Sequence, residues 1–169
     1  MKKTVKLIVC GDGGVGKTSF LNRLIHDNFN NNSKLTKGVD FFSKILTIRG
    51  SIYNFIMWDF AGQRQFKEIL TSFVNGTNSA FILFDLSRLN TFESVEEWIQ
   101  KLNQYGNISV FILGTKFDLI YPSDCMIIED YVSEIINKYR NVLGYFRISS
   151  KTGYNVKKAF NSLIEIIPN

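Results

Sequence analysis

The stretch that decides the fold runs from Gly11 to Thr18 and reads GDGGVGKT. It matches the phosphate-loop pattern, which needs a buried strand before it and a helix after it. Residues 5–10 are an apolar run typical of a strand, and residues 19–25 place their apolar side chains on one side of a helix. A glycine-rich turn is the plainer interpretation, but this context favours a phosphate site. Lys17 can then reach the outer phosphates, and Thr18 offers a hydroxyl to Mg²⁺.

The composition is that of an ordinary globular protein. The 169 residues suffice for one domain with a real core, and 45% are hydrophobic and 21% charged. No apolar run approaches the roughly 20 residues of a membrane span. The N-terminus leads straight into a predicted strand, so we expect no signal peptide. Two cysteines do not make a disulfide framework, and we expect both to be reduced in a cytoplasmic setting.

The charge pattern excludes some kinds of partner and site. The net charge is +5, but the basic residues are scattered, which favours a solvated surface over a nucleic-acid partner. His26 is the single histidine, so we expect no histidine-based metal or catalytic centre.

Strand and helix patterns alternate along the chain, which predicts an α/β fold with a mostly parallel sheet. Runs 41–48 and 52–58 flank Arg49-Gly50-Ser51 and predict a hairpin with one antiparallel edge strand. The polar run 28–34 predicts a mobile loop. Further strands are expected at 80–84, 109–113 and 145–148, a short helix within 62–72, and helices at 91–104 (capped by Thr91), 128–139 and 156–167. No repeat or linker interrupts the pattern, so we expect a single domain.

A carboxylate, a glycine and an amide follow the second hairpin strand. Asp59 could hold Mg²⁺ through water, Gly62 could offer its N–H to a terminal phosphate, and Gln63 could orient an attacking water. Taken alone, this pattern is common, and a capping Asp followed by a turn glycine is the simpler interpretation.

Two further segments follow later strands and have the chemistry to recognise guanine. The Asp118 carboxylate can accept from the ring N–H and the exocyclic amine, a donor pair that adenine lacks, and the Lys116 stem can cover the base. The last strand is followed by Ser149, Ser150 and Lys151, which could contact the guanine O6. Each segment alone could be an ordinary turn.

Thr36 adds a hydroxyl that could complete Mg²⁺ coordination only when a third phosphate is present. By itself it is an ordinary loop threonine. The order of the segments decides the matter, because each follows a strand end, where an α/β sheet binds ligands. Together they predict one guanine-nucleotide site.

In these segments the chain resembles the Ras superfamily of small GTPases over essentially its full length. The segments are GDGGVGKT, TKGVDF around Thr36, WDFAGQ at 58–63, TKFD at 115–118 and SSK at 149–151. TKGVDF and WDFAGQ are most similar to the Rab branch, and TKFD is similar to the Rho branch. The resemblance implies one P-loop GTPase domain over residues 1–169, with a six-stranded sheet, one antiparallel edge strand and about five flanking helices.

The resemblance also implies a GTP/GDP switch that hydrolyses GTP slowly, with effectors, an exchange factor and an activating protein as partners, acting as a monomer. It implies Gln63 and Lys17 as catalytic residues, and Thr18, Thr36 and (through water) Asp59 around Mg²⁺. It implies Phe41, Trp58 and Phe73 as effector-facing aromatics, although simple core packing could also explain them. The nucleotide would contact Gly13, Gly14, Val15, Gly16, Lys17, Thr18, Ser19, Phe29, Thr36, Gly62, Thr115, Lys116, Asp118, Ser149, Ser150 and Lys151.

The chain departs from the family pattern at several positions. Thr115 stands where Asn is common. No arginine is obviously placed to act on the reacting phosphate, although Arg64, next to Gln63, could be a partial substitute. The last residues, Ile-Ile-Pro-Asn, carry no cysteine, so prenylation is not supported here and attachment to a membrane surface stays open. Two alternatives also stay open. One is a GTP-binding interaction module with negligible hydrolysis, and the other is a small P-loop metabolite kinase that uses ATP.

Overall fold

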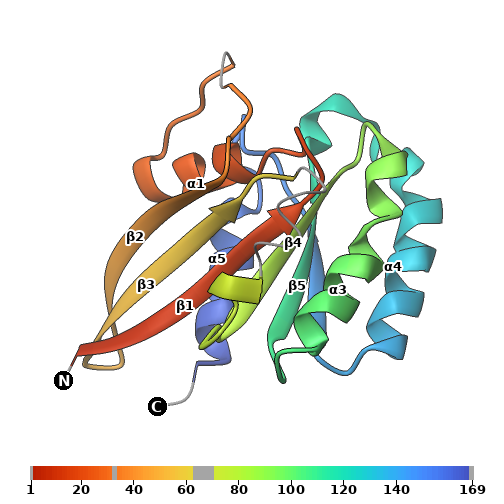
Figure 1. The fold of residues 1–169 in the computed structure, drawn as a ribbon. Coiled ribbons are helices and arrows are strands. Elements are labelled where there is room, and N and C mark those ends of the chain that lie inside the picture. The colour runs from red at the N-terminus through yellow and green to blue at the C-terminus, as the bar shows by residue number, and fades with distance from the viewer. Residues whose placement is uncertain (1, 32–33, 63–70, 168–169) are drawn as a thin grey trace.

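The computed structural model describes residues 2–31, 34–62 and 71–167. Six strands form one sheet in the order β2-β3-β1-β4-β5-β6 (Figure 1). They are β1 Lys2–Gly11, β2 Val39–Ile48, β3 Ser51–Phe60, β4 Ser79–Asp85, β5 Ser109–Thr115 and β6 Val142–Arg147. The β2–β3 pair at the sheet edge is antiparallel, and the other neighbouring pairs are parallel. The predicted α/β fold with one antiparallel edge strand is confirmed.

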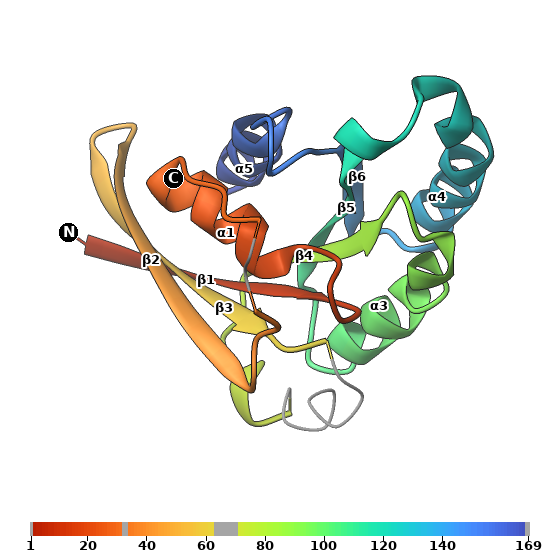
Figure 2. The same cartoon turned by 90° about the horizontal axis from the view of Figure 1, so that it is seen from above.

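Helices cover both faces of this sheet. They are α1 Lys17–His26, α3 Val95–Asn103, α4 Met126–Lys138 and α5 Val156–Glu165. Seen from above, α1 and α5 lie on one face, and α3 and α4 lie on the other (Figure 2). Residues 71–73 are helical, whereas most of the short helix expected within 62–72 falls on residues 63–70, outside the described part of the chain.

The alternation of side chains along β1 divides the core in two. Leu7 and Val9 pack with α1 and α5, whereas Ile8 and Cys10 pack with α3 and α4, because successive strand residues point to opposite faces. Every residue of β4 is buried. The central strands are therefore fixed from both sides, and their carboxyl ends form a rigid edge for the loops that follow.

The helix predicted for residues 91–104 begins later than the sequence suggested. A short 3₁₀ helix spans Leu89–Phe92, and α3 starts only at Val95. Thr91 is not the helix cap. Its hydroxyl accepts from the Asp85 N–H at 2.8 Å and lies 2.7 Å from the Arg88 carbonyl oxygen, so it closes the turn after β4. This local bonding competes with the continuous helix that the side-chain pattern favoured.

Candidate functional site

A cavity of about 360 Å³ opens beside the carboxyl ends of β1, β3, β5 and β6. It is lined by fifteen of the sixteen residues predicted to contact a nucleotide: Gly13, Gly14, Val15, Gly16, Lys17, Thr18, Ser19, Phe29, Thr36, Gly62, Thr115, Lys116, Asp118, Ser150 and Lys151. Asn30, Asn31, Lys34, Leu35, Ala61 and Leu119 complete the wall. Ala61 lies within the WDFAGQ segment, whereas the other five belong to no motif, so the sequence alone could not single those five out. Residues from five distant segments thus meet around one space.

Lys17 lies inside the phosphate loop and is almost fully buried. Its ammonium donates to the carbonyl oxygens of Gly11 at 2.9 Å and Asp12 at 2.7 Å. Burial lowers the pKa of Lys17, and the nearby carboxylates of Asp59 and Asp12 oppose that shift. An anionic phosphate in the cavity would stabilise the charged ammonium in the same way, so the loop presents a cation ready for an anion.

Gly62 approaches the phosphate loop too closely for any side chain. A Cβ atom built on it would lie 2.2 Å from the Asp12 carbonyl carbon and 2.3 Å from the Gly13 nitrogen. The segment after β3 is therefore pressed against the loop at the position where a terminal phosphate is expected. The glycine is required here for close packing as well as for an unhindered N–H.

Three oxygen-bearing side chains gather at the start of α1. The hydroxyl oxygens of Thr18 and Thr36 lie 2.7 Å apart, and Thr18 also donates to Asp59. Asp59 is fully buried, and its Oδ1 finds no hydrogen-bond partner among the described residues. Burial raises the pKa of Asp59 to about 6, although the bond from Thr18 opposes the shift. A buried carboxylate beside two hydroxyls fits a hard divalent cation such as Mg²⁺.

Hydrogen bonds position the residues on the base side of the cavity. Ser149 is buried and does not line the cavity. Its hydroxyl instead donates to Asp118 Oδ1 at 2.6 Å and fixes the carboxylate that faces the space. The hydroxyl of Thr115 lies 2.6 Å from the Val15 carbonyl oxygen and 2.9 Å from that of Phe84. Thr115 therefore links the base side to the phosphate loop.

Arg23 on α1 fixes the loop after β6. Its Nε donates to the Ser150 carbonyl oxygen at 2.7 Å, and its Nη2 donates to that of Lys151 at 2.7 Å. The sequence analysis did not identify this residue, because nothing in a helical arginine indicates a partner over one hundred positions away. The contact holds the backbone that lines the cavity at residues 150 and 151.

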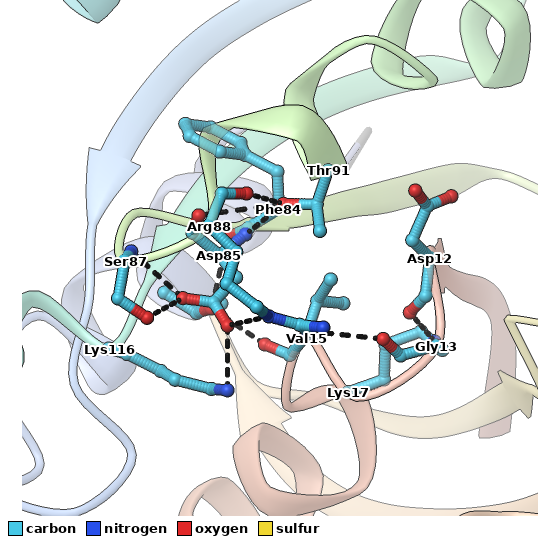
Figure 3. Close-up of polar contacts among 11 residues, drawn as sticks. Asp12, Gly13, Val15, Lys17, Phe84, Asp85, Ser87, Arg88, Thr91 and Lys116 are labelled. Atoms are coloured by element: carbon cyan, nitrogen blue, oxygen red, sulfur yellow. Dashed lines mark hydrogen bonds and ion pairs between the residues drawn. The ribbon is translucent and has the colours of Figure 1, made fainter.

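Asp85 and Arg88 form a second group that the sequence analysis missed. The buried Asp85 carboxylate accepts from Ser87, from Arg88 Nε at 2.8 Å and from Lys116 Nζ at 2.7 Å (Figure 3). Arg88 Nη2 then donates to the Gly13 carbonyl oxygen at 3.2 Å. Asp85 ends β4 directly opposite Thr115, and a strand-end carboxylate could have been noticed. For Arg88 no such signal exists. Arg64, the possible partial substitute for an arginine at the reacting phosphate, lies outside the described residues.

The remaining predicted residues fall in two groups. Gln63, the proposed catalytic amide, lies outside the described residues. Phe41, Trp58 and Phe73 form a continuous row, with ring centroids 4.3 Å apart for the first pair and 5.0 Å for the second. Phe41 is 54% exposed, and Trp58 and Phe73 are partly buried against the core. The row therefore combines core packing with an exposed end.

Comparison with known proteins agrees with this geometry. Residues 6–169 match the family model described as Ras family. The chain belongs to the Ras family of small GTPases. Among its relatives, this Ras-family chain is 35% identical over 159 residues to the Ras-related protein Rab-36 of Mus musculus and 34% identical over 161 residues to Rab-34 of the same species.

These alignments cover 92% and 94% of the Ras-family chain but 59% and 61% of the two relatives. The chain thus spans about three fifths of the length of these curated proteins. No helix in the described part of the chain is long and apolar enough to cross a membrane.

Proposed function

We propose that this Rab-like chain is a GTP/GDP switch that binds GTP with Mg²⁺ and hydrolyses it slowly to GDP and phosphate. The observation that carries the proposal is one cavity of about 360 Å³ that both the phosphate loop and Asp118 line, beside the Thr18–Thr36–Asp59 oxygens. This arrangement suits a purine nucleotide with a chain of phosphates and a divalent cation.

Each end of the cavity has its own role in binding. Lys17 exchanges its bonds to loop carbonyls for bonds to the outer phosphates, and the loop N–H groups and the start of α1 stabilise the negative charge. Asp118, fixed by Ser149, accepts from the two guanine donors, while the Lys116 stem covers the base and Phe29 lies beside it. Adenine offers no such donor pair, which supports GTP over ATP.

Hydrolysis and switching depend on the groups around the terminal phosphate. Gln63 orients the attacking water, and Lys17 offsets the charge that develops on the transferred phosphoryl group. Bound Mg²⁺ would neutralise phosphate charge, with Thr18, Thr36 and Asp59 holding it. Thr36 and Gly62 contact the third phosphate or its cation, so its loss releases the two segments that carry them.

The released segments flank the aromatic row, which suggests how the state is communicated. In the sequence, Phe41 and Trp58 lie between Thr36 and Gly62, and Phe73 follows Gly62. Phe41 is exposed. Effectors that recognise the row would therefore sense the bound nucleotide. An exchange factor and an activating protein would set the rates of loading and hydrolysis, and binding of effectors to the GTP state would serve signalling or trafficking.

The test is a nucleotide-exchange binding assay followed by single-turnover measurement of GTP loss. We expect GTP and GDP to bind in preference to ATP, and Gln63→Leu to bind GTP normally but to hydrolyse it more slowly. A preference for ATP would favour a metabolite kinase. Equal rates in the wild type and Gln63→Leu would favour a binding module that does not hydrolyse GTP.

A further inference from the structure

The segment from Asp85 to Ser94 contacts the phosphate loop through residues that do not line the nucleotide cavity. Arg88 Nη2 donates to the Gly13 carbonyl oxygen at 3.2 Å, and the Ser94 hydroxyl donates to Asp12 Oδ1 at 2.5 Å. A second hollow lies between the segment and the loop, lined by Asp12, Gly13, Gly62, Arg88, Asn90, Thr91 and Ser94. Two successive residues of the loop are thus held by one segment.

Arg88 is itself held at its other edge. Its Nε donates to Asp85 Oδ2 at 2.8 Å, and the same oxygen accepts from Lys116 Nζ at 2.7 Å (Figure 3). The buried Asp85 carboxylate therefore bonds both to Lys116, on the base side of the cavity, and to Arg88, which contacts the phosphate loop. Charge-assisted bonds of this kind are stronger than neutral ones and are directional for a planar guanidinium.

The Arg88 guanidinium packs closely against the phosphate loop at Gly14. A Cβ atom at Gly14 would lie 3.3 Å from Arg88 Nη2, tighter than ordinary contact. The guanidinium therefore packs over the loop at two neighbouring residues, bonding one and covering the other. The contact is specific in geometry, since one nitrogen faces Asp85 and another faces Gly13.

We propose that Arg88 is a positioning residue that straps the phosphate loop into its nucleotide-binding shape, with Asp85 coupling this strap to Lys116 on the base side. The inference rests on the proposed guanine-nucleotide binding and goes beyond it, because it assigns retention of the nucleotide to a residue outside the cavity lining. Loss of the strap leaves the loop free to relax, so bound GDP dissociates faster.

The charge of Arg88 and its bridging geometry can be separated by substitution. Arg88→Ala removes both. Arg88→Lys keeps the positive charge near Asp85 but lacks the second nitrogen needed to reach Gly13 at the same time. If the strap is what matters, both variants release GDP faster by a similar factor, roughly five- to twentyfold, as expected for one charge-assisted bond. Arg140→Ala, an exposed arginine on the α4–β6 connection, is the matched control and should leave release unchanged.

The experiment measures release of a fluorescent GDP from the full chain after addition of excess GDP, with Mg²⁺ present. Asp85→Asn should release GDP at least as fast as Arg88→Ala, and the double variant should be no faster than Asp85→Asn alone, because both changes break one network. Ser94→Ala should accelerate release independently of Arg88. Melting temperatures without nucleotide should stay close for the wild type and Arg88→Ala, while the increment that GDP adds should shrink in the variant.

The outcomes distinguish this inference from the proposed function. A wild-type chain that retains no guanine nucleotide would overturn both. Retention by the wild type with unchanged release in Arg88→Ala would overturn the strap alone. Wild-type release in Arg88→Lys beside fast release in Arg88→Ala would show that only the charge matters, which also overturns the strap.

Discussion

The Thr115 hydroxyl lies 2.6 Å from the Val15 carbonyl oxygen, although the two residues are 100 positions apart. Thr115 ends β5, and Val15 lies in the phosphate loop, so a buried hydrogen bond joins the two halves of the candidate site. The family commonly carries a longer amide side chain at this position. Here a shorter hydroxyl makes the link, and it also lies 2.9 Å from the Phe84 carbonyl oxygen on β4.

Removal of this hydroxyl should destabilise the chain and loosen its hold on GDP. Thr115→Val keeps the shape but removes the buried hydroxyl, which can donate to one of these two carbonyl oxygens at a time, and this costs about 1–3 kcal/mol. Urea unfolding should report the loss of stability, and GDP release should be faster. Thr115→Ser keeps the hydroxyl and should behave much more like the wild type. If Thr115→Val matches the wild type in both assays, the hydrogen bond contributes little.

Asp118 should determine the preference for guanine over a base without the exocyclic amine. Wild-type chain should bind GDP more tightly than IDP, whose hypoxanthine lacks this amine, by roughly 10- to 100-fold. Asp118→Ala should lower GDP affinity and bring the two affinities close together. Asp130→Ala, an exposed carboxylate on α4, serves as the control. A preference for GDP that survives in Asp118→Ala would assign guanine recognition to another residue.

Thr36 should matter more for GTP than for GDP. The hydroxyl of Thr36 lies beside that of Thr18, where it can join a cation that also contacts the third phosphate. Thr36→Ala should therefore accelerate release of a nonhydrolysable GTP analogue several-fold in Mg²⁺ and change GDP release little. Chelation of Mg²⁺ with EDTA should abolish this difference between variant and wild type. An equal effect on both nucleotides would contradict the assignment.

Arg23 should stabilise the loop that faces the guanine O6. Arg23→Ala removes the two donors to the Ser150 and Lys151 carbonyl oxygens, and GDP release should accelerate about tenfold. Arg23 also pairs with the exposed Asp27 at 3.2 Å. Asp27→Asn removes only that exposed pair and should have little effect. Equal release in wild type and Arg23→Ala would show that the loop keeps its shape unaided.

Asp85 should make the stability of the chain depend on acid. Burial pushes the pKa of Asp85 upward, but hydrogen bonds from Lys116, Ser87 and Arg88 outweigh it and hold the pKa below its ordinary value. Since the folded pKa is depressed, the carboxylate contributes stability above the unfolded value of about 4 and loses it as the pH falls toward the folded pKa. The difference in unfolding free energy between the wild type and Asp85→Asn should shrink between pH 7 and pH 3. A constant difference would mean that Asp85 does not titrate differently on folding.

The parts of the fold that were predictable depend on local pattern. Apolar runs and glycines identified the strands, the hairpin and the phosphate loop, because burial on a sheet and tight turns leave direct marks in sequence. The start of α3 could not be predicted, since the Thr91 hydroxyl bonds to the end of β4 instead of capping the helix that follows. The bonding of Thr91 depends on the end of β4 lying beside it in the folded chain, which the local sequence pattern does not show.

In the candidate site, too, the residues set by local sequence pattern could be predicted, and those set by contacts between distant elements could not. Fifteen predicted residues line one cavity, and most of them belong to short motifs that follow strands β1, β3, β5 and β6. Ser149 was expected to contact the base but supports Asp118 from behind. Arg23 and Arg88 could not be found, because long flexible side chains reach partners set by the packing of distant elements.

The bond between Arg23 and the backbone of Ser150 and Lys151 also has a consequence for synthesis. The phosphate loop leaves the ribosome well before the residues that close the base side of the cavity, because more than one hundred positions separate the two segments. During synthesis the phosphate loop can form first. The guanine side of the cavity is complete only after β6 has joined the sheet and Arg23 has bonded to the Ser150 and Lys151 carbonyl oxygens. Stable capture of a nucleotide is therefore expected only after residues 150 and 151 have been synthesised and have met Arg23.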